Sequence, residues 1–189
     1  MHLYIGVTNR IFDAVEEETN ILKEQKKVSK TAYQWAHDAP RNVVKEKYWG
    51  GNLNGQMCNR LLKHSEEMTH WLPKELKGYG EALTLLSKVK KSCFSMDLEE
   101  NWEDDLNKFL KKYQELDLGW TPKTHVMKVH VKQFIKMTGH ALGRYTEQPF
   151  EAIHKEFKNI WSNYKRQGNN KTYPTQLCNC VVAYNSNNL

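Results

Sequence analysis

The spacing of apolar and polar residues predicts helices along most of the chain. Residues 2–26 combine apolar positions with an exposed acidic run at residues 16–18, as expected for one long helix or two short ones. Further helical patterns cover residues 56–70, 98–116 and 121–138, the last beginning at a Thr-Pro step that suits a first helical turn. We therefore predict a mainly α, multi-helix fold.

Glycine, proline and asparagine mark the expected breaks between these helices. The predicted breaks fall at residues 38–40, at residues 48–55, at Pro73, Gly78 and Gly80, and in a short loop bracketed by Gly139 and Gly143.

The clearest helical pattern lies near the C-terminal end. Apolar residues recur there at steps of three and four and define one face: Phe150, Ile153, Phe157, Ile160, Trp161 and Tyr164. We expect one helix over residues 147–166, ended by Gly168-Asn169-Asn170. This divides the chain into a helical region, residues 1–167, and a loosely ordered tail, residues 168–189, in which residues 181–184 suit a short strand.

Composition limits the class of protein. The 189 residues, 39% of them apolar, suffice for one domain with a real core. No stretch approaches the ~18 to 20 uncharged apolar residues of a membrane span, and the four cysteines lack the dense spacing of a secreted disulfide framework. We expect a soluble intracellular protein, without membrane association.

Positive charge is concentrated in one part of the chain. Residues 123–171 hold ten Lys and Arg against three acids, so this segment carries +7. The rest of the chain carries −1, which gives the net charge of +6. An acidic run at residues 97–105 precedes it. Such a segment attracts a polyanion such as DNA, since phosphate neutralisation releases counterions. An ordinary solvated helical surface explains the charge equally well.

Two small constellations carry candidate chemistry. Glu151 and His154 are neighbours at the border of the apolar helical face, where a carboxylate can hold a divalent cation beside a DNA phosphate. The competing interpretation is a surface ion pair between Glu151 and Lys155. His125 and His130 are candidate zinc ligands, but five residues on a regular helix turn them ~140° apart, and ordinary core or surface histidines stay an alternative.

Motifs of other enzyme classes are missing from the sequence. It contains no P-loop, no glycine-rich dinucleotide loop, no His-Glu-x-x-His and no Gly-x-Ser-x-Gly. A nucleotide-dependent enzyme is therefore not expected.

The order of these features resembles a known family. The matching run is Lys123-x-His125-x4-His130-x3-Phe134, then Gly139-x3-Gly143, then Thr146-Glu147-x3-Glu151-x2-His154-x2-Phe157. It is similar to the end of the catalytic region of Transib-type DNA transposases and the V(D)J recombinase. Weaker likenesses occur at Met1–Gly6, at Leu53-Asn54-Gly55 and at Arg60-Leu61-Leu62.

The resemblance implies an RNase H-like Asp-Asp-Glu enzyme that uses Mg²⁺ or Mn²⁺. It places the catalytic acid at Glu151, with Glu147 as the alternative, because the spacing from the second histidine departs by one residue. In the family, the histidine pair shares Zn²⁺ with an upstream Cys-x-x-Cys. That cysteine pair and the two catalytic aspartates, which lie on the β-sheet, are not in this sequence. The expected fold is thus a helical insertion region plus the terminal catalytic helix.

The function expected from the resemblance is that of part of a cut-and-paste transposase, inactive alone but able to bind double-stranded DNA. The expected DNA contacts are Arg60, Lys132, Arg144, Lys155 and Lys158. A nuclear location follows, as does a homodimer for the full-length family enzyme. The alternative is a non-catalytic helical module of transposon origin that binds DNA or a protein partner.

Overall fold

The computed structural model describes residues 2–46, 50–145 and 182. The chain divides after Tyr145 into two units, and the first unit carries the fold described below. The expected helix at residues 147–166 and the expected boundary at residue 167 lie outside the described residues. Val182 is helical, so it does not belong to the short strand expected at residues 181–184.

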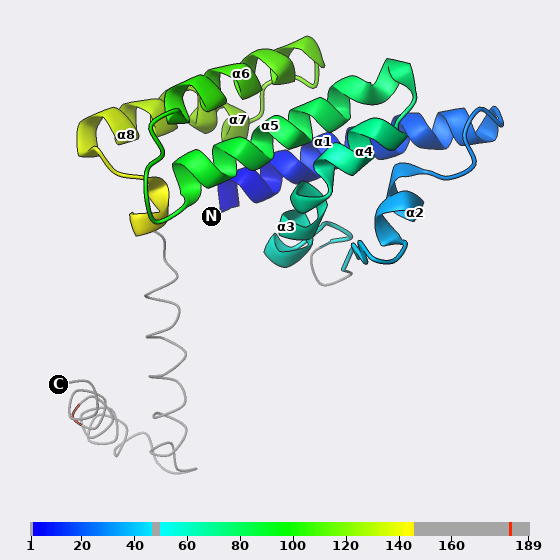
Figure 1. Cartoon of the computed structure of the whole chain (residues 1–189), viewed down its shortest axis with the longest axis horizontal. Coiled ribbons are helices and arrows are strands. Elements are labelled where there is room, and N and C mark those ends of the chain that lie inside the picture. The colour runs from blue at the N-terminus through cyan, green and yellow to red at the C-terminus, as the bar shows by residue number, and fades with distance from the viewer. Residues whose placement is uncertain (1, 47–49, 146–181, 183–189) are drawn as a thin grey trace, which may run out of the picture. The chain divides into compact units, whose positions relative to one another are not determined.

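The described unit is built from helices (Figure 1). They are α1 (His2–Glu24), α2 (Ala32–His37), α3 (Gly55–Lys63), α4 (Ser65–Trp71), α5 (Lys77–Phe94), α6 (Trp102–Glu115), α7 (Pro122–Val126) and α8 (Lys132–Thr138). Short helical turns occupy Lys74–Leu76, Met127–Val131 and Leu142–Tyr145. No β-strand occurs among residues 2–46 and 50–145, only one antiparallel bridge between Glu46 and Asn52. The mainly α prediction is confirmed.

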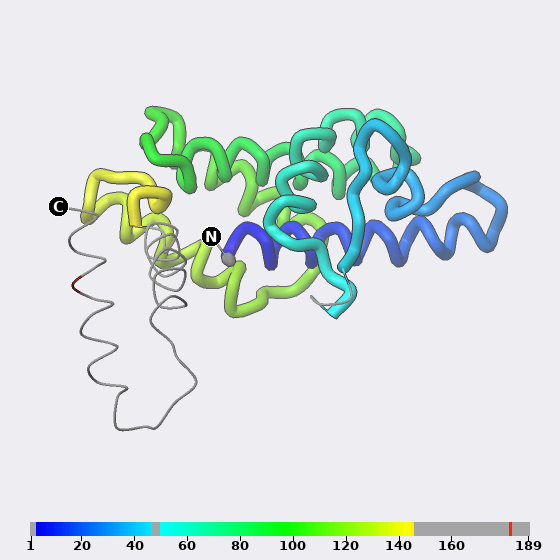
Figure 2. Tube along the Cα trace, turned by 90° about the horizontal axis from the view of Figure 1, so that it is seen from below, coloured from blue at the N-terminus to red at the C-terminus, as the bar shows by residue number. Residues whose placement is uncertain are grey.

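Helix α5 occupies the centre of the unit. It contacts α1, α3, α4 and α6, and Figures 1 and 2 show α1 and α6 running alongside it. Its buried residues, such as Leu83, Leu86 and Val89, join one continuous core with residues from the neighbouring helices, including Phe12 and Phe109. Because these four helices pack against α5 on several sides, it is the central element of the core.

The first helix agrees with its pattern. Residues 2–24 form the single helix α1, and Val7, Ile11 and Val15 line its buried face at a spacing of four. Among its buried polar residues, Thr8 is satisfied locally, since its hydroxyl donates to the carbonyl of Tyr4 at 2.8 Å.

The prediction of joints at Gly78 and Gly80 was wrong, because both glycines lie inside α5. A Cβ on Gly80 would lie only 2.7 Å from the Cα of Thr69 in α4. Gly80 therefore allows two helices to approach closely, a role that a single sequence does not distinguish from a break. Pro73 does mark a joint, between α4 and α5.

The prediction of one helix over residues 56–70 was also wrong, because this segment forms two helices, α3 and α4, separated at His64. The Ser65 hydroxyl donates to the carbonyl of Leu62 at 2.8 Å, a local bond that competes with the helical ladder. The short helix α2, capped by Thr31, was not predicted.

The chain from Pro122 to Thr138 is helical throughout, as predicted. Thr121 and Thr124 form a reciprocal capping box at its start, and proline occupies the first turn. Gly139 ends it with a left-handed backbone, φ 68°. This segment carries the candidate site.

The substitution Gly80→Ala should lower the free energy of unfolding by about 1–3 kcal/mol, measured by urea denaturation. The added methyl meets the Thr69 backbone, which cannot move without displacing α4. This cost exceeds the gain of ~1 kcal/mol in helix propensity.

Gly78→Ala is the matched control on the same helix. The nearest atom to its new methyl is the end of the Leu116 side chain, at 3.2 Å. We expect stability to stay unchanged or to rise by up to ~1 kcal/mol. Equal destabilisation by both substitutions would contradict a specific contact between α4 and α5 at Gly80.

Candidate functional site

The two candidate zinc ligands lie side by side. Met127–Val131, between α7 and α8, forms a π-helical turn, which holds one more residue than an α turn. The extra residue rotates His130 toward His125, and their ring centroids are 5.7 Å apart in an edge-to-face arrangement. Both residues are exposed. The irregular turn removes the ~140° separation that a regular helix would impose.

Among the described residues, no third candidate ligand lies beside His125 and His130. Within that part of the chain, no group of three His, Cys, Asp or Glu residues is arranged to hold a metal ion. Burial raises the pKa of the Cys58 thiol to about 12 and that of Cys93 to about 11. Both thiols therefore stay protonated and belong to the core. The two imidazoles could therefore supply two of the four ligands of a tetrahedral zinc ion.

Two of the predicted DNA contacts are paired with acids. The Lys132 ammonium lies 2.5 Å from Oε1 of Glu103, which also accepts Lys136 at 3.0 Å. Arg144 reaches Asp97 at 3.4 Å and donates to the carbonyl of Met96. Hydrogen bonds from Lys132 and Lys136 hold the pKa of Glu103 below its usual range, so it stays ionised.

These pairs join the acidic run to the basic segment. Residues 97–105 contain six acids and no Lys or Arg, whereas residues 123–145 contain five Lys and Arg and no acid. The described part of the basic segment is therefore partly neutralised within the fold. Lys123 and Lys128 form no ion pair there, and Lys128 lies 4.5 Å from the centre of the Trp120 ring.

Within the described residues, the structure does not bring the other predicted site residues close to the histidine pair or to α8. Arg60 is exposed on α3 and donates to the carbonyl of Asn42 at 3.2 Å. Figures 1 and 2 both show α3 well separated from α8. Glu151, Lys155 and Lys158 lie outside the described residues.

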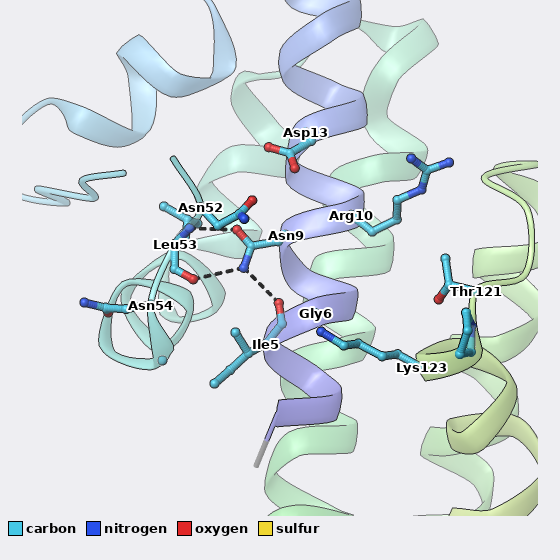
Figure 3. Close-up of a pocket in the computed structure, with 12 residues that line it drawn as sticks. Ile5, Gly6, Asn9, Arg10, Asp13, Asn52, Leu53, Asn54, Thr121 and Lys123 are labelled. Atoms are coloured by element: carbon cyan, nitrogen blue, oxygen red, sulfur yellow. Dashed lines mark hydrogen bonds between the residues drawn. The ribbon is translucent and has the colours of Figure 1, made fainter. Parts of the chain in front are cut away.

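A cavity of about 570 Å³ opens between α1, the turn before α3 and the start of α7 (Figure 3). The sequence pattern did not predict this cavity, although three segments that resemble the family contribute to its wall. The lining residues are Ile5, Gly6, Asn9, Arg10, Asp13, residues 52–55, and residues 121–123.

Asn9 ties two walls of the cavity together. Its side-chain amide donates to the carbonyls of Ile5 and Leu53, both at 3.0 Å, and its oxygen accepts from the Leu53 backbone at 2.8 Å. Figure 3 shows these bonds bridging α1 and the turn. Asn9 is 8% exposed and fully bonded, so its role is structural.

The purified chain should bind Zn²⁺ weakly, because two imidazoles do not close a tetrahedral shell. We expect zinc to be lost on dialysis against a mild chelator, measured by atomic absorption. Under direct titration, His125→Ala and His130→Ala should each weaken the remaining binding. Stoichiometric zinc that survives dialysis would contradict this, and the variants Cys178→Ser and Cys180→Ser would then test the cysteines as further ligands.

Comparisons with protein-family models, with curated proteins and with solved structures found no match. Within residues 2–46 and 50–145, no helix combines the length and the apolar character needed to cross a bilayer.

Proposed function

We propose that the chain is a helical part of a cut-and-paste DNA transposase of the Transib type, and that by itself it binds duplex DNA. The observation that supports this best is the pairing of His125 and His130. In the family that the sequence resembles, a histidine pair at this separation shares a zinc ion. The π-helical turn supplies the proximity that sharing requires and that a regular α-helix would prevent.

The proposal assigns Glu151 as the family's third catalytic carboxylate, with Glu147 as the alternative. In the family, three acids hold two Mg²⁺ or Mn²⁺ ions, which activate the attacking oxygen and stabilise the leaving oxygen of the phosphodiester. One carboxylate does not position two ions. We therefore propose that this chain alone does not cut DNA and that its activity is binding, with a nuclear location.

Binding would come from exposed cations that contact phosphates. Lys128 and Lys123 form no ion pair within the described residues, and Lys132, Lys136 and Arg144 become available if DNA displaces their carboxylate partners. Such contacts carry no base information, so the proposed binding is independent of sequence.

A second candidate is a non-catalytic helical module that binds a protein partner. The same ion pairs favour it, because they reduce the positive charge that the α8 region offers to DNA. Direct measurement of DNA binding separates the two candidates.

We expect the chain to bind a labelled ~20-bp duplex in fluorescence anisotropy at ~50 mM salt, with similar affinity for two unrelated sequences. The logarithm of affinity should fall linearly with the logarithm of salt concentration, by about 0.9 per phosphate contact. Lys155→Gln combined with Lys158→Gln should weaken both duplexes alike and flatten the slope by up to about two units.

Two results would contradict this proposal in different ways. If the chain nicks DNA in a reaction that needs Mg²⁺ or Mn²⁺ and is abolished by Glu151→Gln, the proposal that it does not cut DNA is overturned. No binding to either duplex at ~50 mM salt would overturn DNA binding and favour the protein-binding module.

Glu103→Gln should raise affinity for both duplexes about two- to fivefold, because an exposed ion pair is worth up to ~1 kcal/mol and DNA no longer has to break it. The substitution releases Lys132 and Lys136 together. We also expect the affinity of this variant to fall more steeply with salt than that of the unaltered chain, because the two released lysines add phosphate contacts. Anisotropy measures this slope.

Glu100→Gln is the control, since it changes the net charge equally. Glu100 is exposed and has no ion pair within the described part of the chain. It should raise affinity less than Glu103→Gln does. Equal increases would show that total charge, and not release of the α8 lysines, controls binding.

A further inference from the structure

Three segments far apart in the sequence meet at the cavity shown in Figure 3. Gly6 comes from α1, Asn54 and Gly55 from the start of α3, and Lys123 from the first turn of α7. None of these residues belongs to the hydrophobic core. Residues next to them, such as Val7, Leu53 and Met57, do belong to it, so the core brings the segments together and leaves these four residues around the cavity.

Most polar side chains around the cavity are already occupied. Asn54 accepts a hydrogen bond from the Met57 backbone at 2.9 Å and donates to Glu46 at 2.6 Å. The Asp13 carboxylate is neutralised by Lys45 at 2.8 Å. These groups, like Asn9, hold the walls in place and offer little to a ligand.

Two cations remain to face a ligand. Arg10 lines the cavity, donates from one terminal nitrogen to the carbonyl of Leu118 at 2.9 Å and also bonds to the Tyr113 side chain, which leaves its remaining guanidinium hydrogens for a ligand. Lys123 forms no ion pair within the described residues, whereas Lys132 and Lys136 share Glu103. The cavity thus combines two cations with one neutralised acid.

The path of the Lys123 side chain depends on Gly6. In Figure 3 the lysine extends across the cavity toward α1 at Gly6. A Cβ on Gly6 would lie 2.5 Å from the Lys123 ammonium nitrogen and still closer to its Cδ. Glycine inside a helix is unfavourable by itself. Its presence here leaves room for the lysine, which directs the ammonium along the cavity wall.

We propose that this cavity binds a phosphate group at Lys123, with Arg10 supplying a second positive charge in the cavity lining. Two cations on different helices attract a doubly charged anion more strongly than a singly charged carboxylate. Phosphate oxygens also accept several hydrogen bonds from lysine and arginine. A volume of about 570 Å³ accommodates the phosphate together with an attached sugar or base.

Isothermal titration calorimetry at ~50 mM salt tests this, with inorganic pyrophosphate and a deoxynucleoside monophosphate as probes. Lys123→Gln should weaken both probes about tenfold or more, because a charge-assisted bond is lost. Gly6→Ala keeps every charge but displaces the lysine, so it should weaken them similarly. Urea denaturation checks that each variant is folded. If Gly6→Ala does not fold, the result for Lys123→Gln alone decides the test.

Lys128→Gln is the matched control. It removes the same charge from the same segment, but Lys128 lies over Trp120 and does not line the cavity. It should leave binding of both probes nearly unchanged. An equal loss in Lys128→Gln, or no binding of either probe to the unaltered chain, would overturn the proposal.

The source of the phosphate is decided by competition. If duplex DNA displaces pyrophosphate and Lys123→Gln weakens DNA more than Lys128→Gln does, the bound group is a nucleic-acid phosphate. If DNA does neither, the site takes a free phosphorylated compound. Either result supports the phosphate site. DNA binding that persists without any binding of the small probes would sink this proposal and leave the proposed function standing.

Discussion

The close packing of α5 against its neighbours is the constraint on which the described unit depends. Gly80 lets α4 approach until a methyl group would meet the Thr69 backbone, and Leu83 and Leu86 fill the space toward the other helices. A helix covered on several sides loses contacts in every direction when it shifts. The packing of α5 therefore fixes the positions of α1, which lines the cavity, and of α6, which carries Glu103.

Local irregularity gives the candidate site its geometry. Between α7 and α8 the chain accommodates one extra residue in a π-helical turn, and His125 and His130 become neighbours. Met127 and Val131, within the same turn, stay buried. The turn therefore keeps its apolar side in the core while the imidazoles face outward. π-helical turns occur often at functional sites, where they redirect a side chain without ending the helix.

Electrostatics links the two oppositely charged segments. Glu103, at the start of α6, is held ionised by Lys132 and Lys136, while Asp97 accepts Arg144. Exposed pairs of this kind contribute little to stability and are screened by salt. Their effect is larger on binding, because any polyanion must replace carboxylates that already occupy the lysines. The cavity beside α1 differs, since Lys123 has no such carboxylate within the described residues.

The sequence by itself determined the mainly α fold, the helical character of residues 2–24 and the helix start at Thr121, because helical spacing and capping are local properties. It also singled out His125 and His130. Only the tertiary structure decided that Gly80 is a contact, that a π-helical turn brings the histidines together, and that Glu103 pairs with Lys132 and Lys136 of α8. Each of these depends on a backbone irregularity or on partners distant in sequence, which periodicity does not encode.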